Sequence, residues 1–191
     1  MSYREDNYYI NKVLKGNLAS FAILVGKHKD LAYTLALRIA KNKEDAEEIA
    51  QDAFLKAYNS LNSFKNEAKF STWLYKIIYN TAISRFRKKH IDSHSLDNSP
   101  LKESLHEESI DGLDVMHLKD RKKIISEAIG RLKEDERVAM TLYYLGENST
   151  KEIKEITGFT NSNVKILLHR GRNNLLFELK KILKEEIVDI L

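Results

Sequence analysis

Apolar residues recur every three or four positions along most of the chain, which is the spacing that places them on one face of an α-helix. Phe21, Leu24, Ala32, Leu35 and Ile39 form one such stripe. Runs in which apolar and polar residues alternate, as expected of strands, are not found in the sequence. The 191 residues also contain only one proline and seven glycines. The pattern therefore predicts an all-α protein.

The same periodicity and the capping residues predict where the helices lie. In the first half of the chain, helices are expected at 6–15, from an N-cap at Asn17 to about 40, at 44–61, and from an N-cap at Ser71 or Thr72 to about 89. In the second half, two helices are expected between 119 and 146, one at 149–157 and one from 161 to about 176. Residues 180–191 are expected to extend the last helix.

The stretch 93–118 breaks this regular pattern. It contains the only proline (Pro100), five serines and a net charge of −5, and its periodicity is weak. These features are typical of a segment that joins two domains. The sequence therefore predicts two small helical domains, 1–92 and 119–191, joined by a flexible acidic linker, with a short helix possible near 101–107.

Charge is distributed unevenly, although the net charge is only +4. Residues 44–55 hold five acids and no base, whereas 64–89 carries +6. Opposite signs in separate blocks indicate different partners for different parts of the chain. Asp45, Glu48 and Asp52 share one face of the third expected helix with Gln51 nearby. This face is either a solvated surface or a docking surface for a basic partner, and the sequence leaves both open.

Aromatic and basic residues are interleaved between Phe64 and Lys89. Aromatic rings stack on unpaired bases while lysine and arginine follow the phosphates, so this composition is typical of single-stranded nucleic-acid binding. A polar loop carrying Asn66, Lys69 and Ser71 could bond the edge of a flipped base. The alternative is structural: Trp73 and the other apolar residues at helical spacing belong in the core.

Residues 149–176 have the pattern of a helix-turn-helix. Ser149 and Glu152 form a capping box, which marks a helix start, and Gly158 lies in the following turn. The second helix, from Asn161, has several polar and basic residues and no acid before Glu178. Such a helix can read base edges in the major groove. Helix-glycine-helix patterns also occur in plain bundles, so this stretch alone leaves a structural role open.

Other classes of site find little support in the sequence. There are no cysteines, which excludes disulfides and thiolate metal sites. His28 lies alone on its stripe and is expected to be structural, so neither a metal nor a cofactor is predicted. No apolar run reaches about 18 residues, and the polar N-terminus does not fit a signal peptide. A cytoplasmic protein without membrane insertion is expected.

Taken together, these stretches resemble bacterial sigma factors of the extracytoplasmic-function type, within the sigma-70 family. Residues 45–64 are similar to the segment of the second conserved region that binds core polymerase. Residues 64–89 are similar to the part that melts and reads the minus-ten element, and 128–172 to the fourth region, which reads the minus-thirty-five element. The resemblance implies a transcription initiation factor that directs RNA polymerase core to promoters and has no enzymatic activity. Its implied partners are the clamp helices of the largest polymerase subunit, the flap, promoter DNA and an anti-sigma factor.

The resemblance also implies three groups of contact residues. The polymerase would be bound by Asp45, Glu48, Ile49, Gln51, Asp52 and Leu55. The minus-ten element would be bound by Phe64, Lys65, Asn66, Lys69, Phe70, Ser71, Thr72, Lys76, Tyr79, Asn80 and Arg87. The minus-thirty-five element would be bound by Lys151, Asn161, Ser162, Asn163, Lys165, His169, Arg170 and Arg172.

The chain departs from the family pattern at three places. Lys154 stands where a small residue is usual, so its side chain must extend outward. The family's Ser-Glu-Gly is replaced by Asn161, Ser162 and Asn163, which prevents transfer of a promoter sequence. Leu168 replaces a frequent arginine.

Two other functions compete with this interpretation. A stand-alone helix-turn-helix regulator would explain 149–176 but would leave the acidic helix and the basic aromatic segment without a role. A nuclease using Glu47, Glu48 and Asp52 as metal ligands would need further ligands converging from another helix, and no second motif supplies them.

Overall fold

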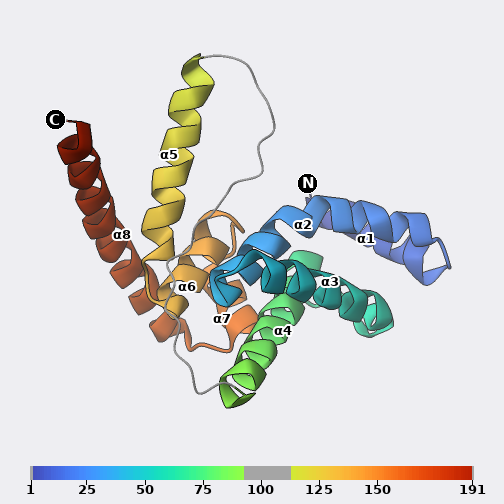
Figure 1. Ribbon diagram of the computed structural model, residues 1–191. Helices are drawn as coiled ribbons and strands as arrows, with labels where there is room; N and C mark the ends of the chain where they lie inside the picture. Colours follow the sequence, from blue (N-terminus) through green and yellow to red (C-terminus); the bar gives the residue numbers. More distant parts are fainter. Residues whose placement is uncertain (1, 93–112, 191) are drawn as a thin grey trace.

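The computed structural model of the chain describes residues 2–92 and 113–190 (Figure 1). Most of the predicted linker, including the possible helix near 101–107, lies outside these residues. The described parts contain no strand and consist of helices joined by short turns. The helices are α1 (Ser2–Leu14), α2 (Leu18–Ala40), α3 (Lys43–Asn59), α4 (Phe70–Asp92), α5 (Leu113–Gly130), α6 (Glu134–Tyr144), α7 (Thr150–Thr157) and α8 (Asn161–Ile190), with a 3-10 turn at Leu61–Ser63. The predicted all-α fold is confirmed.

Local capping residues set several helix ends. The Asn17 side chain accepts a hydrogen bond from the Ser20 amide at 3.1 Å, which caps α2 as predicted. Both halves of the predicted capping box at Ser149 and Glu152 are present at the start of α7. Gly158 ends α7 with φ of 78°, a left-handed conformation that glycine adopts without strain.

Two helix starts differ from the sequence prediction. α4 begins at Phe70 because the Trp73 amide already bonds the carbonyl of Lys69, so Ser71 and Thr72 lie inside the helix instead of capping it. α5 begins at Leu113, six residues before the expected start at 119. The acidic composition of 93–118 therefore did not mark the end of the linker.

A buried polar network fastens α1 to the rest of the N-terminal half. The Asp6 carboxylate lies 3.2 Å from Nε2 of His28, and the other ring nitrogen lies 3.3 Å from the Tyr75 hydroxyl. All three residues are buried. His28 thus has two hydrogen-bonding partners inside the fold, and its predicted structural role is confirmed.

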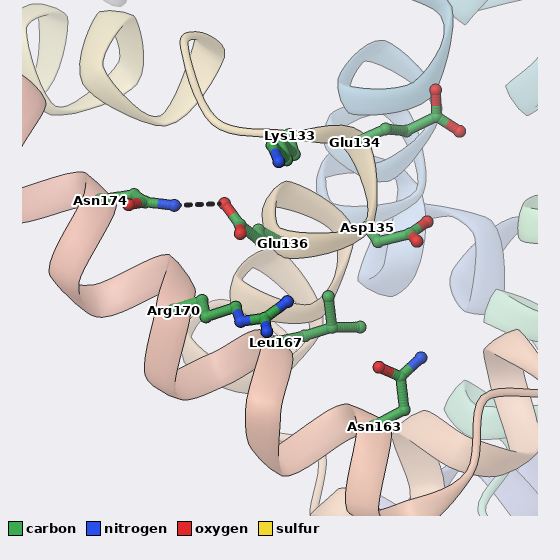
Figure 2. Close-up of a pocket in the computed structure, with 8 residues that line it drawn as sticks. All are labelled: Lys133, Glu134, Asp135, Glu136, Asn163, Leu167, Arg170 and Asn174. Carbon is green, nitrogen blue, oxygen red and sulfur yellow. Dashed lines mark hydrogen bonds between the residues drawn. The ribbon is translucent and has the colours of Figure 1, made fainter.

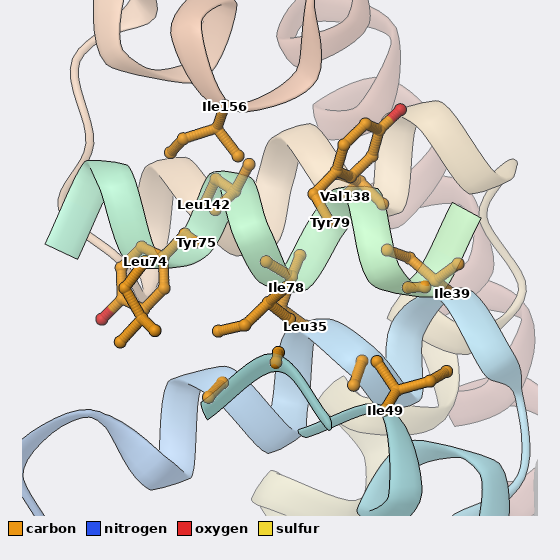
Figure 3. Packing of buried hydrophobic residues seen from close by; sticks show 14 of the residues in the cluster. Leu35, Ile39, Ile49, Leu74, Tyr75, Ile78, Tyr79, Val138, Leu142 and Ile156 are labelled. Atoms are coloured by element: carbon orange, nitrogen blue, oxygen red, sulfur yellow. The ribbon is translucent and has the colours of Figure 1, made fainter. Parts of the chain in front are cut away.

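The two halves of the chain share one hydrophobic core. α4 lies between α2 and the C-terminal helices, and Ile78 of α4 is buried in the same cluster as Leu142 of α6 and Ile156 of α7 (Figure 3). Polar contacts cross the same boundary: Arg38 Nη2 of α2 donates to the Ser126 hydroxyl of α5 at 3.2 Å. The described parts of the two predicted domains therefore pack directly against each other.

Candidate polymerase and nucleic-acid interfaces

The acidic face of α3 is largely exposed. Its first turn is capped by Asn42, whose side chain accepts from the Asp45 amide at 2.8 Å. Asn42 Nδ2 also donates to Asp45 Oδ2 at 2.7 Å, and the Asp45 side chain is 18% exposed. Of the residues expected to contact polymerase, Glu48, Gln51, Asp52 and Leu55 are exposed. Leu55 is 62% exposed. This face combines negative charge with an apolar side chain.

Ile49 does not belong to this exposed surface. It is only 2% exposed and packs in the core with Ala46 and Ala53. The expectation that Ile49 contacts polymerase is therefore corrected for this structure: Ile49 lies on the inner side of α3, while the acids lie on the outer side.

Arg85 of α4 reaches the acidic face of α3. Its guanidinium forms a close ion pair with Glu48 and lies 3.5 Å from an Asp45 oxygen. The bond to Glu48, together with the charges of Asp45 and Asp52, raises the pKa of Arg85. Arg85 belongs to the basic block 64–89, which is separated along the chain from the acidic block 44–55. Nothing in the sequence indicates that the two blocks meet in the fold. Part of the acidic face is thus already paired within the chain.

The segment expected to bind the minus-ten element divides into an exposed and a buried set. Asn66 has φ of 58°, which turns the loop before α4. The side chain of Arg87 is outside the described set, and Ser71 is half-buried. The exposed members are Lys65, Asn66, Lys69, Lys76 and Asn80. These side chains offer three cations and two amides to a ligand.

The buried members correct the sequence interpretation. Phe64, Phe70, Thr72 and Tyr79 are each at most 9% exposed. The rings of Phe64 and Phe70 pack against each other with 5.8 Å between centroids, and both contact Trp73. Because these rings fill the core at the start of α4, they cannot stack on bases in this conformation. For Phe64 and Phe70, the structural alternative, in which aromatic residues of this segment belong to the core, therefore holds in this conformation.

Glu152 of α7 also faces this segment. Its carboxylate lies 2.9 Å from Lys69 Nζ and 3.5 Å from the Thr72 hydroxyl. Burial favours the neutral acid, but the bonds from Lys69 and Ser149 outweigh it and hold the pKa of Glu152 below its usual value. The helix-turn-helix therefore contacts the start of α4 through a charged pair.

Every residue expected to bind the minus-thirty-five element is exposed. The start of α8 is fixed by Val164, which is fully buried, and by Thr160, whose hydroxyl accepts from the Asn163 amide at 3.1 Å. The exposed residues are Lys151, Asn161, Ser162, Asn163, Lys165, His169, Arg170 and Arg172. Lys154 is exposed, as predicted, whereas Leu168 is 3% exposed. Position 168 therefore points into the core and not toward a ligand.

Two of the basic residues on α8 have neighbours that the sequence did not indicate. Arg172 Nε donates to the Tyr144 hydroxyl at 2.7 Å, and its guanidinium lies 5.8 Å from the Tyr143 and Tyr144 ring centroids. Arg170 lines a pocket of about 690 Å³ between α8 and the start of α6 (Figure 2). The sequence feature that could have indicated the Arg172 contact is the pair of consecutive tyrosines at the end of α6.

The described part of the chain presents neither a metal-binding cluster nor a membrane-spanning helix. Among the side chains that the structure describes, no three of His, Cys, Asp or Glu come together in a way that could hold a metal ion. Glu47, Glu48 and Asp52 accordingly do not form such a group. Within the same residues, no helix combines the length and apolar character needed to cross a membrane.

Comparison with known proteins gives consistent matches. Residues 24–90 match the family model for sigma-70 region 2, and residues 122–175 match that for sigma-70 region 4. The chain is 36% identical over 181 residues to the ECF RNA polymerase sigma factor SigW of Bacillus subtilis, covering 91% of this chain and 96% of the relative. It is 30% identical over 178 residues to the sigma-E factor of Escherichia coli, covering 87% of this chain and 90% of the relative.

The fold is similar to that of the sigma factor RpoE from Bartonella quintana, solved in complex with the anti-sigma factor NepR. The TM-score is 0.69 at 23% identity, covering 85% of this chain and 98% of that chain. The matches to both conserved regions, in the expected order, and the full-length similarity to SigW agree with the exposed acidic helix and the helix-turn-helix. The chain belongs to the sigma-70 family and is a sigma factor of the extracytoplasmic-function type.

Proposed function

We propose that this sigma factor binds core RNA polymerase through the exposed outer face of α3. The observation that carries the proposal is the row of Asp45, Glu48 and Asp52 beside the 62% exposed Leu55. A cluster of this kind suits a partner that combines basic side chains with an apolar contact, since charge complementarity speeds and orients association. The clamp helices of the largest subunit are the proposed partner, with the flap contacting the C-terminal half.

The same proposal assigns promoter DNA to two other surfaces. The exposed cations and amides before and along α4 would hold the minus-ten element, and Lys65, Asn66 and Lys76 are among these exposed residues. The start of α8 would enter the major groove at the minus-thirty-five element. Its exposed Asn161 and Asn163 are suited to base edges, and Lys165 to a phosphate.

Co-elution with bacterial core RNA polymerase on size exclusion tests the polymerase interface. Asp52→Lys should abolish co-elution, because it reverses an exposed charge of the row, at the end next to Leu55. Glu47→Lys is the matched control: it makes the same charge change on an exposed residue of α3, about 140° away around the helix axis. Equal loss of co-elution with both variants would mean that net charge, and not this face of α3, determines binding. Co-elution of the Asp52→Lys variant with polymerase would refute the interface.

We further propose that the chain acts by binding and carries out no catalytic step. Incubating it with Mg²⁺ or Mn²⁺ and labelled DNA should leave the DNA intact. An anti-sigma protein is included among the proposed partners, supported by the similarity to a fold solved with NepR. Co-purification of a polypeptide that is displaced by core polymerase would identify it.

A further inference from the structure

The end of α6 contacts α8, the helix proposed to read duplex DNA, at Arg172. Arg172 Nε donates to the Tyr144 hydroxyl at 2.7 Å, and its guanidinium lies 5.8 Å from the centroid of the Tyr144 ring. Both residues are exposed, and Tyr144 is exposed to 53%. Tyr144 is not among the residues expected to contact either promoter element. The contact therefore adds an aromatic hydroxyl to a surface that was identified by its cations and amides.

Close packing of α6 against α8 fixes this contact. Gly171, the residue before Arg172, is buried, and a Cβ there would lie 2.8 Å from Met140 Cγ, closer than carbon atoms pack favourably. Met140 and Tyr144 are four residues apart on α6 and therefore share a face. The close approach at Gly171 thus brings the next residue of α8 beside Tyr144. The pair is held by the positions of two backbones and not by two flexible side chains alone.

Arg172 lies on the face of α8 that is proposed to enter the major groove. It follows the reading residues Asn161 and Lys165 by eleven and seven positions, spacings that return to the same side of a helix. Both of these residues are exposed. At 1.5 Å per residue, Arg172 lies about 10 Å further along the axis than Lys165. Base edges are read near the start of such a helix, so Arg172 is suited to the phosphate backbone beside the groove.

The hydrogen-bonding groups of the pair suit one phosphate. The bond to Tyr144 uses the N–H of Nε, so the terminal nitrogens of Arg172 keep their N–H donors for an anion. A hydroxyl that accepts a hydrogen bond still has its own proton to donate. The guanidinium and the hydroxyl can therefore donate to the same phosphate. Because each already restrains the other, less side-chain freedom is lost when the phosphate binds.

We infer that Tyr144 is a DNA-contact residue, which holds Arg172 in place and donates its hydroxyl proton to the same backbone phosphate. The inference rests on the proposed function, which places the start of α8 in the major groove. It adds the C-terminal end of α6 to the duplex-binding surface. Since phosphate contacts carry no base information, the pair strengthens duplex binding for every sequence alike.

Binding of the full chain to a fluorescent duplex of mixed sequence tests the inference, with affinities measured by anisotropy at several salt concentrations. Tyr144→Phe removes only the hydroxyl and should weaken binding about fivefold, the order expected for one net hydrogen bond. Tyr143→Phe is the matched control, because it removes a hydroxyl from the neighbouring ring, and it should leave the affinity unchanged. Equal affinities of the two variants would overturn the inference.

Stability is measured on the same variants by urea unfolding. Tyr144→Phe should leave the urea midpoint unchanged, because the ring that packs on Arg172 is retained and its site is exposed. A midpoint that falls together with the affinity would assign the hydroxyl to the packing of α6 on α8, and would overturn its role in DNA binding.

A double-mutant cycle with Arg172→Ala shows whether the two residues act together. Arg172→Ala alone should weaken binding and lower the salt slope by about one unit. Adding Tyr144→Phe to Arg172→Ala should weaken binding by less than about twofold more, because no guanidinium remains to be held. A full fivefold effect in that background would mean that the residues act independently, and would overturn the shared phosphate contact.

Failure of the proposed function would give a different result. Lys165→Ala supplies the reference, since Lys165 lies on the same face of α8 and is exposed. Weaker binding by Lys165→Ala and Arg172→Ala, with no change in Tyr144→Phe, would overturn the inference alone. Unchanged binding by all three variants would remove this face of α8 from the duplex-binding surface, and would overturn the proposed minus-thirty-five contact together with the inference.

Discussion

Replacing Arg137 should destabilise the whole fold, because one fully buried side chain ties three segments together. Arg137 of α6 is 0% exposed. Its Nε donates to the Arg38 carbonyl near the end of α2 at 2.6 Å. Its Nη1 donates to the carbonyls of Gly130 and Leu132, at 3.0 and 3.1 Å, in the turn between α5 and α6. Arg137→Met keeps most of the side-chain length and removes all three bonds.

The cost follows from the carbonyls left behind. A buried acceptor that loses its partner costs about 1–3 kcal/mol. The lower value applies here because removing a buried guanidinium also relieves its desolvation. Three carbonyls at about 1 kcal/mol each give a loss of about 3 kcal/mol in the free energy of unfolding. For a chain of this length, that corresponds to a fall in Tm of roughly 6–12 °C.

Urea unfolding followed by circular dichroism measures this loss, with Arg131→Met as the control. Arg131 is exposed and pairs with Glu127 at 2.8 Å, so its replacement should cost less than about 1 kcal/mol. Because the bond to Arg38 crosses between the two halves, Arg137→Met should also broaden or split the transition. A loss below about 1 kcal/mol, with one sharp transition, would refute the reasoning from unsatisfied carbonyls.

Other substitutions probe the N-terminal network, the helix contacts and the DNA surface. Burial opposes ionisation of Asp6, but the bonds from His28 and Lys27 outweigh it and hold the pKa of Asp6 below its usual value. The ionised carboxylate therefore stabilises the fold above about pH 4, and this stabilisation is lost as the pH falls further. Asp6→Asn should flatten that acidic part of a profile of unfolding free energy against pH. Arg85→Ala should change the unfolding free energy by less than about 1 kcal/mol, because its ion pairs are partly exposed; a larger loss in urea unfolding would show that they hold α3 against α4. Arg172→Ala should reduce the salt slope of duplex binding by about one unit, and an unchanged slope would remove Arg172 from the phosphate contacts.

Local features of the fold could be predicted from the sequence because their causes lie within a few residues. The cap at Asn17, the capping box at Ser149 and the turn at Gly158 depend only on neighbouring backbone groups. The start of α4 was misplaced, because Ser71 and Thr72 are good capping residues by type. The helix instead starts one residue earlier, since the Trp73 amide bonds the Lys69 carbonyl.

The surfaces were harder to predict than the helices. Periodicity identifies an apolar stripe, but it does not tell which aromatic residues at its edge are inside. The sequence therefore assigned Phe64 and Tyr79 to the DNA surface, whereas both are buried in the fold. Contacts between distant segments, such as Arg85 with Glu48 or Glu152 with Lys69, have no local signature. They depend on how the helices meet, and here they join parts with opposite charge.

Because α8 is one long helix, movement at one of its ends is transmitted to the other. Its 30 residues form one helix about 45 Å long, with the reading residues at one end. In its middle, Phe177 and Leu176 are 66% and 55% exposed. The helix runs beside α5 (Figure 1). A tilt of about 10° displaces one end relative to the other by about 8 Å, more than the rise of a full helical turn. A protein that binds the C-terminal end of α8 and tilts the helix would therefore also displace the reading residues at its N-terminal end.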